Sequence, residues 1–482
     1  MLKKIFFCLV LLTSLSAKGQ VFTVSGIAKT YAGDTLKMYV VDDYITKNES
    51  LIASAKVDSD GNFTLSGNIK DVKVAYIDLT VFKGRIFLGP NLKEEIVLPE
   101  KQQITLQDKL NPYFKKAEFF VKVINQKDKE DLNLLIPEFE KYFNSAMGKV
   151  FYSVKGVSKA TVDSMENVIN QKFTTKNQYF NDYKKYRYAL LDYTAYHRSK
   201  DDIVKELFTG KEILINSPAY AELFDELFTN VFTSGKTSAI VIKDLYQGIY
   251  DKSYNTLKRK MMSEPKVGGE KFADYLILKG LKDSYYSDSF PKESLVAVAD
   301  SVAMMSKTKD FRQIAAKLSE KFTTLLCGYA PPEIFLRDDK GLEYSYQKSS
   351  GKFVYLTFYN PNSYAAYADL DLLKQIRKGF PEDVLEIVMI FVSDKKEKMT
   401  EFLKKETDVT WKVLWYGFDN ELLKSYNVRA FPVYYMLNPQ GKLSMNPAPS
   451  PQEDFVLKFN AAYRNWKNDQ YRQQYRENQG IK

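Results

Sequence analysis

Hydrophobic and polar positions alternate along the first hundred residues, in short runs that turn residues separate. Phe63-Thr64-Leu65 alternates strictly, and so does the stretch from Ile77 to Val81. A period of two places every second side chain on the same face, which is typical of strands that bury one face of a sheet. Several such runs at close spacing predict an N-terminal β-sandwich over 20–110.

Asp58-Ser59-Asp60-Gly61-Asn62 stands between two of these runs. Glycine and Asp or Asn tolerate positive φ, so the segment predicts a hairpin turn. Its acid spacing resembles part of a calcium loop, but the glutamate that would complete such a loop is missing. We therefore expect a turn and no calcium site.

The period changes from two to between three and four at about residue 112. Leu132, Leu135, Phe139 and Phe143 follow this spacing, and the pattern continues to about residue 326. It predicts a central irregular helical domain over 111–327. Ser217-Pro218 is a favourable helix start, with serine as the N-cap and proline in the first turn.

The last third alternates strands and helices. Phe353–Phe358 and Val384–Val392 are continuous apolar runs, which a sheet centre buried on both faces requires. An amphipathic helix between them implies parallel pairing through a right-handed crossover. We predict a C-terminal α/β domain over 328–468, followed by a polar tail over 469–482. The fold class is then multidomain α+β.

The first nineteen residues are predicted to be a secretory signal peptide. Lys3 and Lys4 precede a short apolar run, and Ala17-Lys18-Gly19 has the small residues of a cleavage site. The bulky Phe7 before Cys8 argues against a lipid anchor at that cysteine. Nothing later approaches the roughly 20 apolar residues of a transmembrane helix. We expect an exported protein of the periplasm or cell envelope, with no transmembrane span.

Composition narrows the chemistry. The 482 residues include 2 Cys and 1 His, which excludes a zinc ribbon, a CxxCH haem site and a His₃ metal centre. We expect no metal and no cofactor. The net charge is +10, and removal of three lysines with residues 1–19 leaves +7. Because acids are interleaved with these bases throughout, a solvated surface is favoured over nucleic-acid binding.

Three local patterns in the helical domain carry little functional signal. Gly235-Lys236-Thr237 resembles the end of a phosphate-binding loop, but Asn230 stands where that motif needs glycine. His197 has no nucleophile motif nearby, so a surface or packing role is favoured. The tyrosine-rich stretch 179–196 predicts a helix with aromatic residues facing the core, and binding of a glycan or polyanion is the alternative.

The C-terminal domain resembles the exported thioredoxin-like family of the TlpA/ResA type that is common in Bacteroidota. The resemblance rests on the segments 330–336 and 339–341, the strand 355–359, the stretch Tyr426–Pro432 that looks like the family's cis-proline segment, and the hairpin 435–442. It implies a thioredoxin fold. The two domains ahead resemble the N-terminal regions of such proteins.

The family's CxxC motif is missing. The register from the strand 355–359 places its two cysteines at Ser363 and Ala366. Thiol–disulfide exchange needs a thiolate that attacks and a second thiol that resolves the mixed disulfide. A serine hydroxyl and an alanine methyl group supply neither, so we expect no catalytic residue at these positions.

Cys327 is the only cysteine after the predicted cleavage site. It precedes the C-terminal domain and is expected to be a small packed hydrophobe. An oxidoreductase-type enzyme that acts through Cys327, or through an unrecognised site, is the alternative hypothesis.

The resemblance implies a shallow groove in which an extended peptide adds to the loop before the cis-proline. Ser363, Tyr364, Phe431 and Pro432 would line it, unless the segment is kept only for folding. The sequence thus favours a redox-inactive envelope protein that binds a protein or peptide partner. A glycan-binding envelope module is a further alternative, and the oligomeric state stays undetermined.

Overall fold

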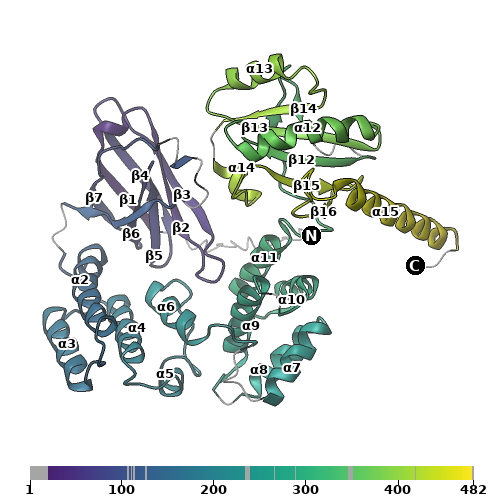
Figure 1. Ribbon diagram of the computed structural model, residues 1–482. Coiled ribbons are helices and arrows are strands. Elements are labelled where there is room, and N and C mark those ends of the chain that lie inside the picture. The colour runs from purple at the N-terminus through teal and green to yellow at the C-terminus, as the bar shows by residue number, and fades with distance from the viewer. Residues whose placement is uncertain are drawn as a thin grey trace, which may run out of the picture. The chain divides into compact units, whose positions relative to one another are not determined.

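The computed structural model describes residues 20–105, 108–109, 111, 114–124, 128–233, 239–264, 266–287, 289–345, 351–417 and 420–479 (Figure 1). The predicted signal peptide and Gly235-Lys236-Thr237 lie outside these residues. Backbone contacts divide the chain into two compact units. Described residues within Met1–Gln102, Lys116–Ser234 and Met261–Lys279 form the first unit, and those within Gln103–Lys115, Gly235–Lys260 and Gly280–Lys482 form the second.

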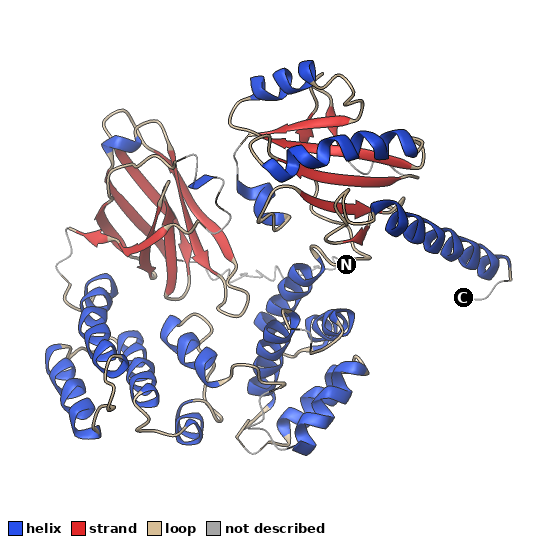
Figure 2. Ribbon diagram, viewed as in Figure 1, coloured by secondary structure: helices blue, strands red, loops and turns tan. Residues whose placement is uncertain are grey.

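The first unit contains two β-sheets, whose strands are red in Figure 2. One sheet has the order β4-β1-β7-β9, with the strands Gln20–Ile27 (β1), Asn62–Ile69 (β4), Lys93–Val97 (β7) and Lys122–Val123 (β9). The other has the order β3-β2-β5-β6-β8, with the strands Thr35–Val41 (β2), Glu49–Lys56 (β3), Lys73–Asp78 (β5), Phe82–Leu88 (β6) and Ala117–Phe120 (β8). A short 3₁₀ helix, Lys29–Tyr31 (η1), follows β1.

The buried side chains of both sheets belong to one hydrophobic cluster. It includes Phe22 of β1 and Leu65 of β4 from one sheet, and Met38 of β2 and Ile77 of β5 from the other. In β4 the buried residues Phe63 and Leu65 alternate with exposed ones, as the sequence predicted. A shared core is what the predicted sandwich needs, and the sandwich layout itself stays a prediction.

The segment from Asp58 to Asn62 forms a turn, but not the turn of a paired hairpin. Asp58 Oδ1 accepts hydrogen bonds from the backbone N–H groups of Asp60 at 2.9 Å and Asn62 at 2.8 Å, and Gly61 has φ +92°. β4 then pairs with β1, whereas β3 pairs with β2. The turn carries the chain from one sheet to the other, which local turn chemistry does not reveal.

Helices follow from residue 132 onward. The first unit holds Leu132–Phe151 (α2), Lys159–Lys172 (α3), Gln178–Thr194 (α4), Lys200–Leu207 (α5) and Pro218–Leu227 (α6). The second holds Ala239–Tyr250 (α7), Lys292–Met305 (α10) and Lys309–Thr323 (α11). Tyr254–Met262 (α8) and Glu270–Tyr285 (α9) cross the boundary between the units.

The predicted helical region contains the expected helix start at Ser217, but it also contains two short strands. Ser217 caps α6 as expected, because its Oγ accepts from the N–H of Tyr220 at 3.3 Å and Pro218 opens the helix. However, β8 and β9 lie at 117–123, where the change of period had suggested helix. Each is an edge strand of two to four residues. A run that short has no measurable period, so pairing with β6 and β7 decides its structure.

The second unit contains a five-stranded sheet with the order β14-β13-β12-β15-β16. Phe353–Tyr359 (β12), Leu385–Val392 (β13) and Lys412–Tyr416 (β14) are parallel to one another. Val433–Leu437 (β15) and Leu443–Met445 (β16) are antiparallel to their neighbours. A small pair, Leu336–Arg337 (β10) and Glu343–Tyr344 (β11), precedes the sheet.

Separate hydrophobic clusters cover the two faces of this sheet. Leu373 of the helix Tyr364–Gly379 (α12) packs with Tyr355 and Ile387 on one face, and Figure 1 shows α12 lying across β12 and β13. Tyr426 packs with Leu356 on the other face. The remaining helices are Lys396–Lys405 (α13), Asn420–Ser425 (α14) and Phe455–Asn478 (α15). All seven residues of β12 are buried, as its continuous apolar run predicted.

The final helix is longer than the sequence indicated. α15 continues to Asn478, through most of the segment 469–482 that was predicted to be a polar tail. This stretch is rich in Arg, Gln and Asn and contains neither proline nor an apolar stripe. Polar residues of this kind permit a helix without a periodic pattern that would indicate it. Among the described residues, no helix is both long and apolar enough to cross a membrane.

Candidate functional site

The sheet register brings two loops of the second unit together. β12 ends at Tyr359, and α12 begins at Tyr364. Phe358 in β12 pairs with Val433, the first residue of β15. The loop that leads into β15 therefore lies beside the carboxyl end of β12, where the start of α12 also lies. Open α/β sheets bind ligands at the carboxyl ends of their strands, so this is the candidate site.

Local hydrogen bonds fix the approach to α12. The side-chain oxygen of Asn360 accepts from the N–H of Asn362 at 2.9 Å, and its backbone oxygen accepts from the N–H of Ser363 at 3.0 Å. Asn360 is buried directly after the strand. These bonds stabilise a tight turn that ends the strand and positions Ser363, the residue before the helix.

Ser363 is the residue that joins the two loops. As N-cap of α12, its Oγ accepts from the N–H of Ala366 at 3.4 Å. The same hydroxyl donates to the backbone oxygen of Phe431 at 2.7 Å. Phe431 precedes Pro432 through a cis peptide bond. The first predicted cysteine position thus faces the cis-proline loop, as a nucleophile at that position would have to.

The side chain at the second predicted cysteine position is fully buried. Ala366 has 0% of its surface exposed and belongs to the hydrophobic cluster beneath α12. It lies one helical turn after Ser363, so the two side chains lie near each other at the helix start. The pair as it stands offers one hydroxyl and one buried methyl group.

The other predicted groove residues differ in how accessible they are. Tyr364 is 88% exposed, whereas Phe431 and Pro432 are half-buried. The carbonyl of Phe431 already accepts the Ser363 hydroxyl, but a carbonyl oxygen has a second lone pair. Its N–H donates to no other described residue. A strand laid against this loop would find a donor, a partly used acceptor and an exposed aromatic ring.

A buried polar network lies beneath the site, and sequence reasoning missed it. Asp369 on α12 accepts from the hydroxyl of Tyr434 at 2.8 Å and from Nε2 of Gln452 at 2.6 Å. Burial, and next the nearby Asp369 carboxylate, hold the pKa of Tyr434 well above its ordinary value, so the hydroxyl stays a donor. The network ties α12 to β15 and to the segment before α15.

A signal for this network was present in the sequence. Asp369 lies three residues after Ala366 and four before Leu373, on the apolar face of the helix. A carboxylate in that position needs a buried partner, because an unpaired buried charge is costly. The partner could not be identified from the sequence, since Tyr434 is 65 positions away.

Cys327 does not lie at the start of α12. The next residue, Gly328, donates to the backbone oxygen of Leu443 at 2.7 Å, and Leu443 donates back to Tyr329 at 2.9 Å. The cysteine therefore lies beside β16, the edge strand two positions away from β12. The thiol is exposed, yet partial desolvation by the surrounding groups raises its pKa, and Glu293 raises it further. Such a thiol forms less thiolate at neutral pH than an ordinary cysteine.

The tyrosine-rich stretch and His197 belong to the first unit. Burial of Tyr183 and Tyr186 confirms that the tyrosine-rich stretch is a helix with its aromatic residues in the core, although Tyr196 is exposed. His197 is half-buried near the end of α4. Among the described residues, no three His, Cys, Asp or Glu side chains are grouped so as to hold a metal ion.

Comparison with known proteins gives solved structures that match little more than a quarter of this chain. A thioredoxin domain of a thiol-disulfide oxidoreductase from Bacteroides vulgatus is 21% identical with a TM-score of 0.26, and the match covers 28% of this chain and 98% of that one. A thiol:disulfide interchange protein from a Bacteroides species is 20% identical with a TM-score of 0.26, covering 28% and 91% of the two chains.

No family model matches the chain. No curated protein matches it either. The two solved structures named above are a thioredoxin domain and a thiol–disulfide protein of low identity. The candidate site is defined by the strand register and by the hydrogen bonds of Ser363.

Proposed function

We propose that this chain is an exported cell-envelope protein whose thioredoxin-like domain, over 328–468, performs no dithiol chemistry and binds a protein or extended peptide. The proposal includes a signal peptide over 1–19, a β-sandwich over 20–110 and a helical domain over 111–327. The observation that carries it is the hydrogen bond from Ser363 Oγ to the backbone oxygen of Phe431. It places a hydroxyl against the cis-proline loop, where redox chemistry would need a thiolate.

A hydroxyl in that position cannot replace a thiol. Serine does not ionise near neutral pH and forms no disulfide, so no mixed disulfide with a partner can arise. The buried methyl group of Ala366 excludes a resolving step as well. The site still has the backbone hydrogen-bonding groups of Phe431 and the exposed ring of Tyr364. Such groups can bind a peptide, but they cannot transfer electrons.

The alternative through Cys327 has less support. Its raised pKa opposes thiolate formation, and Gly328 and Tyr329 hold it beside β16 rather than at the helix start. A nucleophilic thiol needs a lowered pKa, usually from a helix N-terminus or a neighbouring cation. Among the described residues, neither acts on Cys327, whereas the helix N-terminus of α12 acts on Ser363.

The proposal is tested by restoring the missing sulfur atoms. The double variant Ser363→Cys with Ala366→Cys should form an internal disulfide and catalyse the reduction of insulin by dithiothreitol. The N-terminus of α12 would stabilise the thiolate introduced at position 363, as helix N-termini do for reactive cysteines. Thiol titration and mass spectrometry measure the disulfide, and turbidity measures the reduction.

Two controls make the outcome decisive. The natural chain should be inactive, and Cys327→Ser should change nothing in either background. Activity in the natural chain that Cys327→Ser abolishes would establish the oxidoreductase alternative. A folded double variant that forms no disulfide would show that residues 363 and 366 are not the dithiol positions.

A further inference from the structure

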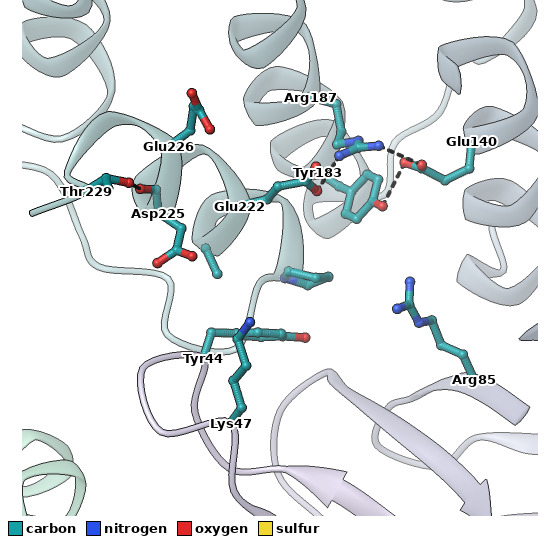
Figure 3. A pocket seen from close by; sticks show the side chains of 12 residues that line it. Tyr44, Lys47, Arg85, Glu140, Tyr183, Arg187, Glu222, Asp225, Glu226 and Thr229 are labelled. Carbon is teal, nitrogen blue, oxygen red and sulfur yellow. Dashed lines mark hydrogen bonds and ion pairs between the residues drawn. The ribbon is translucent and has the colours of Figure 1, made fainter. Parts of the chain in front are cut away.

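A cavity of about 450 Å³ lies within the first unit, far in sequence from the site described above. The loop between β2 and β3 contributes Tyr44 and Lys47, and β6 contributes Arg85. Helices α2, α4 and α6 contribute the opposite side (Figure 3). The volume falls within the range of about 300–1,000 Å³ that is usual for small-ligand pockets.

Hydrogen bonds tie the walls of the cavity together. The Asn133 side chain at the start of α2 bonds both backbone groups of Phe87 in β6, at 2.7 and 3.0 Å, and so anchors the helices to the sheet. Inside, Glu140 accepts from Arg187 at 2.8 Å and from the Tyr183 hydroxyl at 2.8 Å. Pairing makes these buried charges tolerable and fixes the side chains in place. A cavity with such walls needs little reorganisation to bind a ligand.

The side of the cavity formed by the sheet is basic. Nη2 of Arg85 donates a hydrogen bond to the Tyr76 hydroxyl at 3.1 Å and another to the Glu118 carboxylate at 2.9 Å. Among the described residues, its Nη1 and Nε have no hydrogen-bond partner, and Lys47 forms no ion pair. Figure 3 shows both side chains on the sheet side of the cavity, without a bond to the other residues drawn. These groups are free to donate to an anionic group.

The helix side is acidic. Asp225 and Glu226 lie three and four positions after Glu222 on α6, so each is a neighbour of Glu222 on the helix surface. Glu222 pairs with Arg187, and Asp225 pairs with Lys279 at 2.7 Å. Glu226 has no ion-pair partner among the described residues and is exposed at the cavity. This wall offers carboxylate oxygens to a cationic group.

Tyr44 lies beside Lys47 on the sheet side of the cavity (Figure 3). Burial raises the pKa of its phenol well above the ordinary value, so the hydroxyl stays protonated at neutral pH. The ring offers an apolar surface, and its hydroxyl can donate or accept a hydrogen bond. A ligand held at Lys47 would therefore also contact an uncharged, half-buried aromatic group.

We propose that this cavity binds a short zwitterionic peptide, with its carboxylate toward Arg85 and Lys47 and its ammonium group toward Glu226. The separation of charge selects this class: a polyanion would meet the carboxylates of α6, and a polycation would meet Arg85. A neutral sugar would leave both free charges without a partner. The site is independent of the proposed partner binding in the second unit.

Titration calorimetry of the full chain with trialanine tests the proposal. We expect saturable binding of trialanine and none of N-acetyl-trialanine-amide, which has the same backbone and no charge. Arg85→Gln and Glu226→Gln should each weaken binding roughly tenfold or more, because each removes one charge-assisted hydrogen bond. The control Lys159→Gln, on the exposed surface of α3, should leave binding unchanged.

Ligands blocked at one end separate the two walls. N-acetyl-trialanine keeps only its carboxylate, so its weaker binding should still depend on Arg85 but should no longer respond to Glu226→Gln. Glu226 is exposed and pairs with no charged group in the described ranges, so its variant should fold normally, and circular dichroism checks this. Absence of saturable trialanine binding at millimolar concentration overturns the proposal, and so does equal binding of the fully blocked peptide.

Discussion

Ser363 determines what the candidate site can do. One hydroxyl caps α12 and also donates to the cis-proline loop, so a single side chain ties together two segments that are 68 positions apart. Both contacts are hydrogen bonds of an alcohol, and neither involves charge. At this scale, position 363 holds an alcohol that joins the start of α12 to the cis-proline loop.

Substituting Ser363 by alanine should loosen the start of α12. Loss of an N-cap hydroxyl costs about 1 kcal/mol, and loss of the bond to Phe431 adds to it. A cost of that size should speed hydrogen exchange of the Ala366 amide by about fivefold. NMR-detected exchange measures it.

Ser158 provides the matched control for this change. It caps α3 in the same way, accepting from the N–H of Thr161 at 3.2 Å, but it bonds no distant loop in the described part of the chain. Ser158→Ala should therefore affect only its own helix. If Ser363→Ala left the exchange of Val433 in the neighbouring strand as slow as before, the coupling between the loops would be absent.

At the scale of elements, α3 and α4 bury a group of acids between them. Desolvation raises the pKa of Glu166 on α3 to about 7, and Asp192 on α4 raises it next. Asp163 adds to this effect, whereas Lys159 and Arg198 oppose it. Burial raises the pKa of Asp192 as well. One side-chain oxygen of each of Glu166 and Asp192 is buried without a partner among the described residues.

The raised pKa of Glu166 determines how the stability of the folded chain changes with pH. Glu166 binds a proton more tightly in the folded chain than in the unfolded one, where its pKa is about 4.5. Its contribution to stability is therefore complete below pH 4.5 and is lost as the pH rises through 7. Glu166→Gln, which mimics the protonated form, should raise the melting temperature of the first unit at pH 8 and change it little at pH 4.5.

Glu138 on α2 is a control of opposite sign. Hydrogen bonding and charge from Lys141 lower its pKa, so its contribution is present above pH 4.5 and is lost as the pH falls. Glu138→Gln should thus lower the melting temperature slightly at pH 8. Calorimetric scans at the two pH values measure both variants. A melting temperature of Glu166→Gln that follows the natural chain at both would refute the buried-acid interpretation.

At the scale of the whole molecule, the proposed groove predicts that a partner protein contacts Tyr364. Tyr364, 88% exposed, is suited to replacement by the photo-reactive residue benzoyl-phenylalanine. We expect irradiation of cells to give a discrete crosslinked product from position 364. Tyr152 is 89% exposed and lies in the other unit, so it should give no such product.

A second variant links the crosslink to the groove. Phe431→Ala removes the ring beside Pro432 and should reduce the yield at position 364 severalfold. Crosslinking that is unchanged by Phe431→Ala, or equally strong at Tyr152, would mean that the product arises from chance encounters. Immunoblotting of the whole chain measures the yields in all three variants.

The sequence by itself determined the elements with a strong local pattern. The buried strands β12 and β13 and the capped start of α6 at Ser217 were readable because periodicity and capping act within a few residues. The absence of a dithiol at 363 and 366 was also readable, since it is a statement about residue identity.

Tertiary structure alone decided what depends on distant partners. Four features join residues far apart in the chain: the edge strands at 117–123, the pairing of β4 with β1, the hydrogen bond between Asp369 and Tyr434, and the cavity with its two charged walls. Local sequence records the preference of a segment, whereas these features arise from which segments meet. Hydrogen bonds and ion pairs across such distances form only after those segments have packed together.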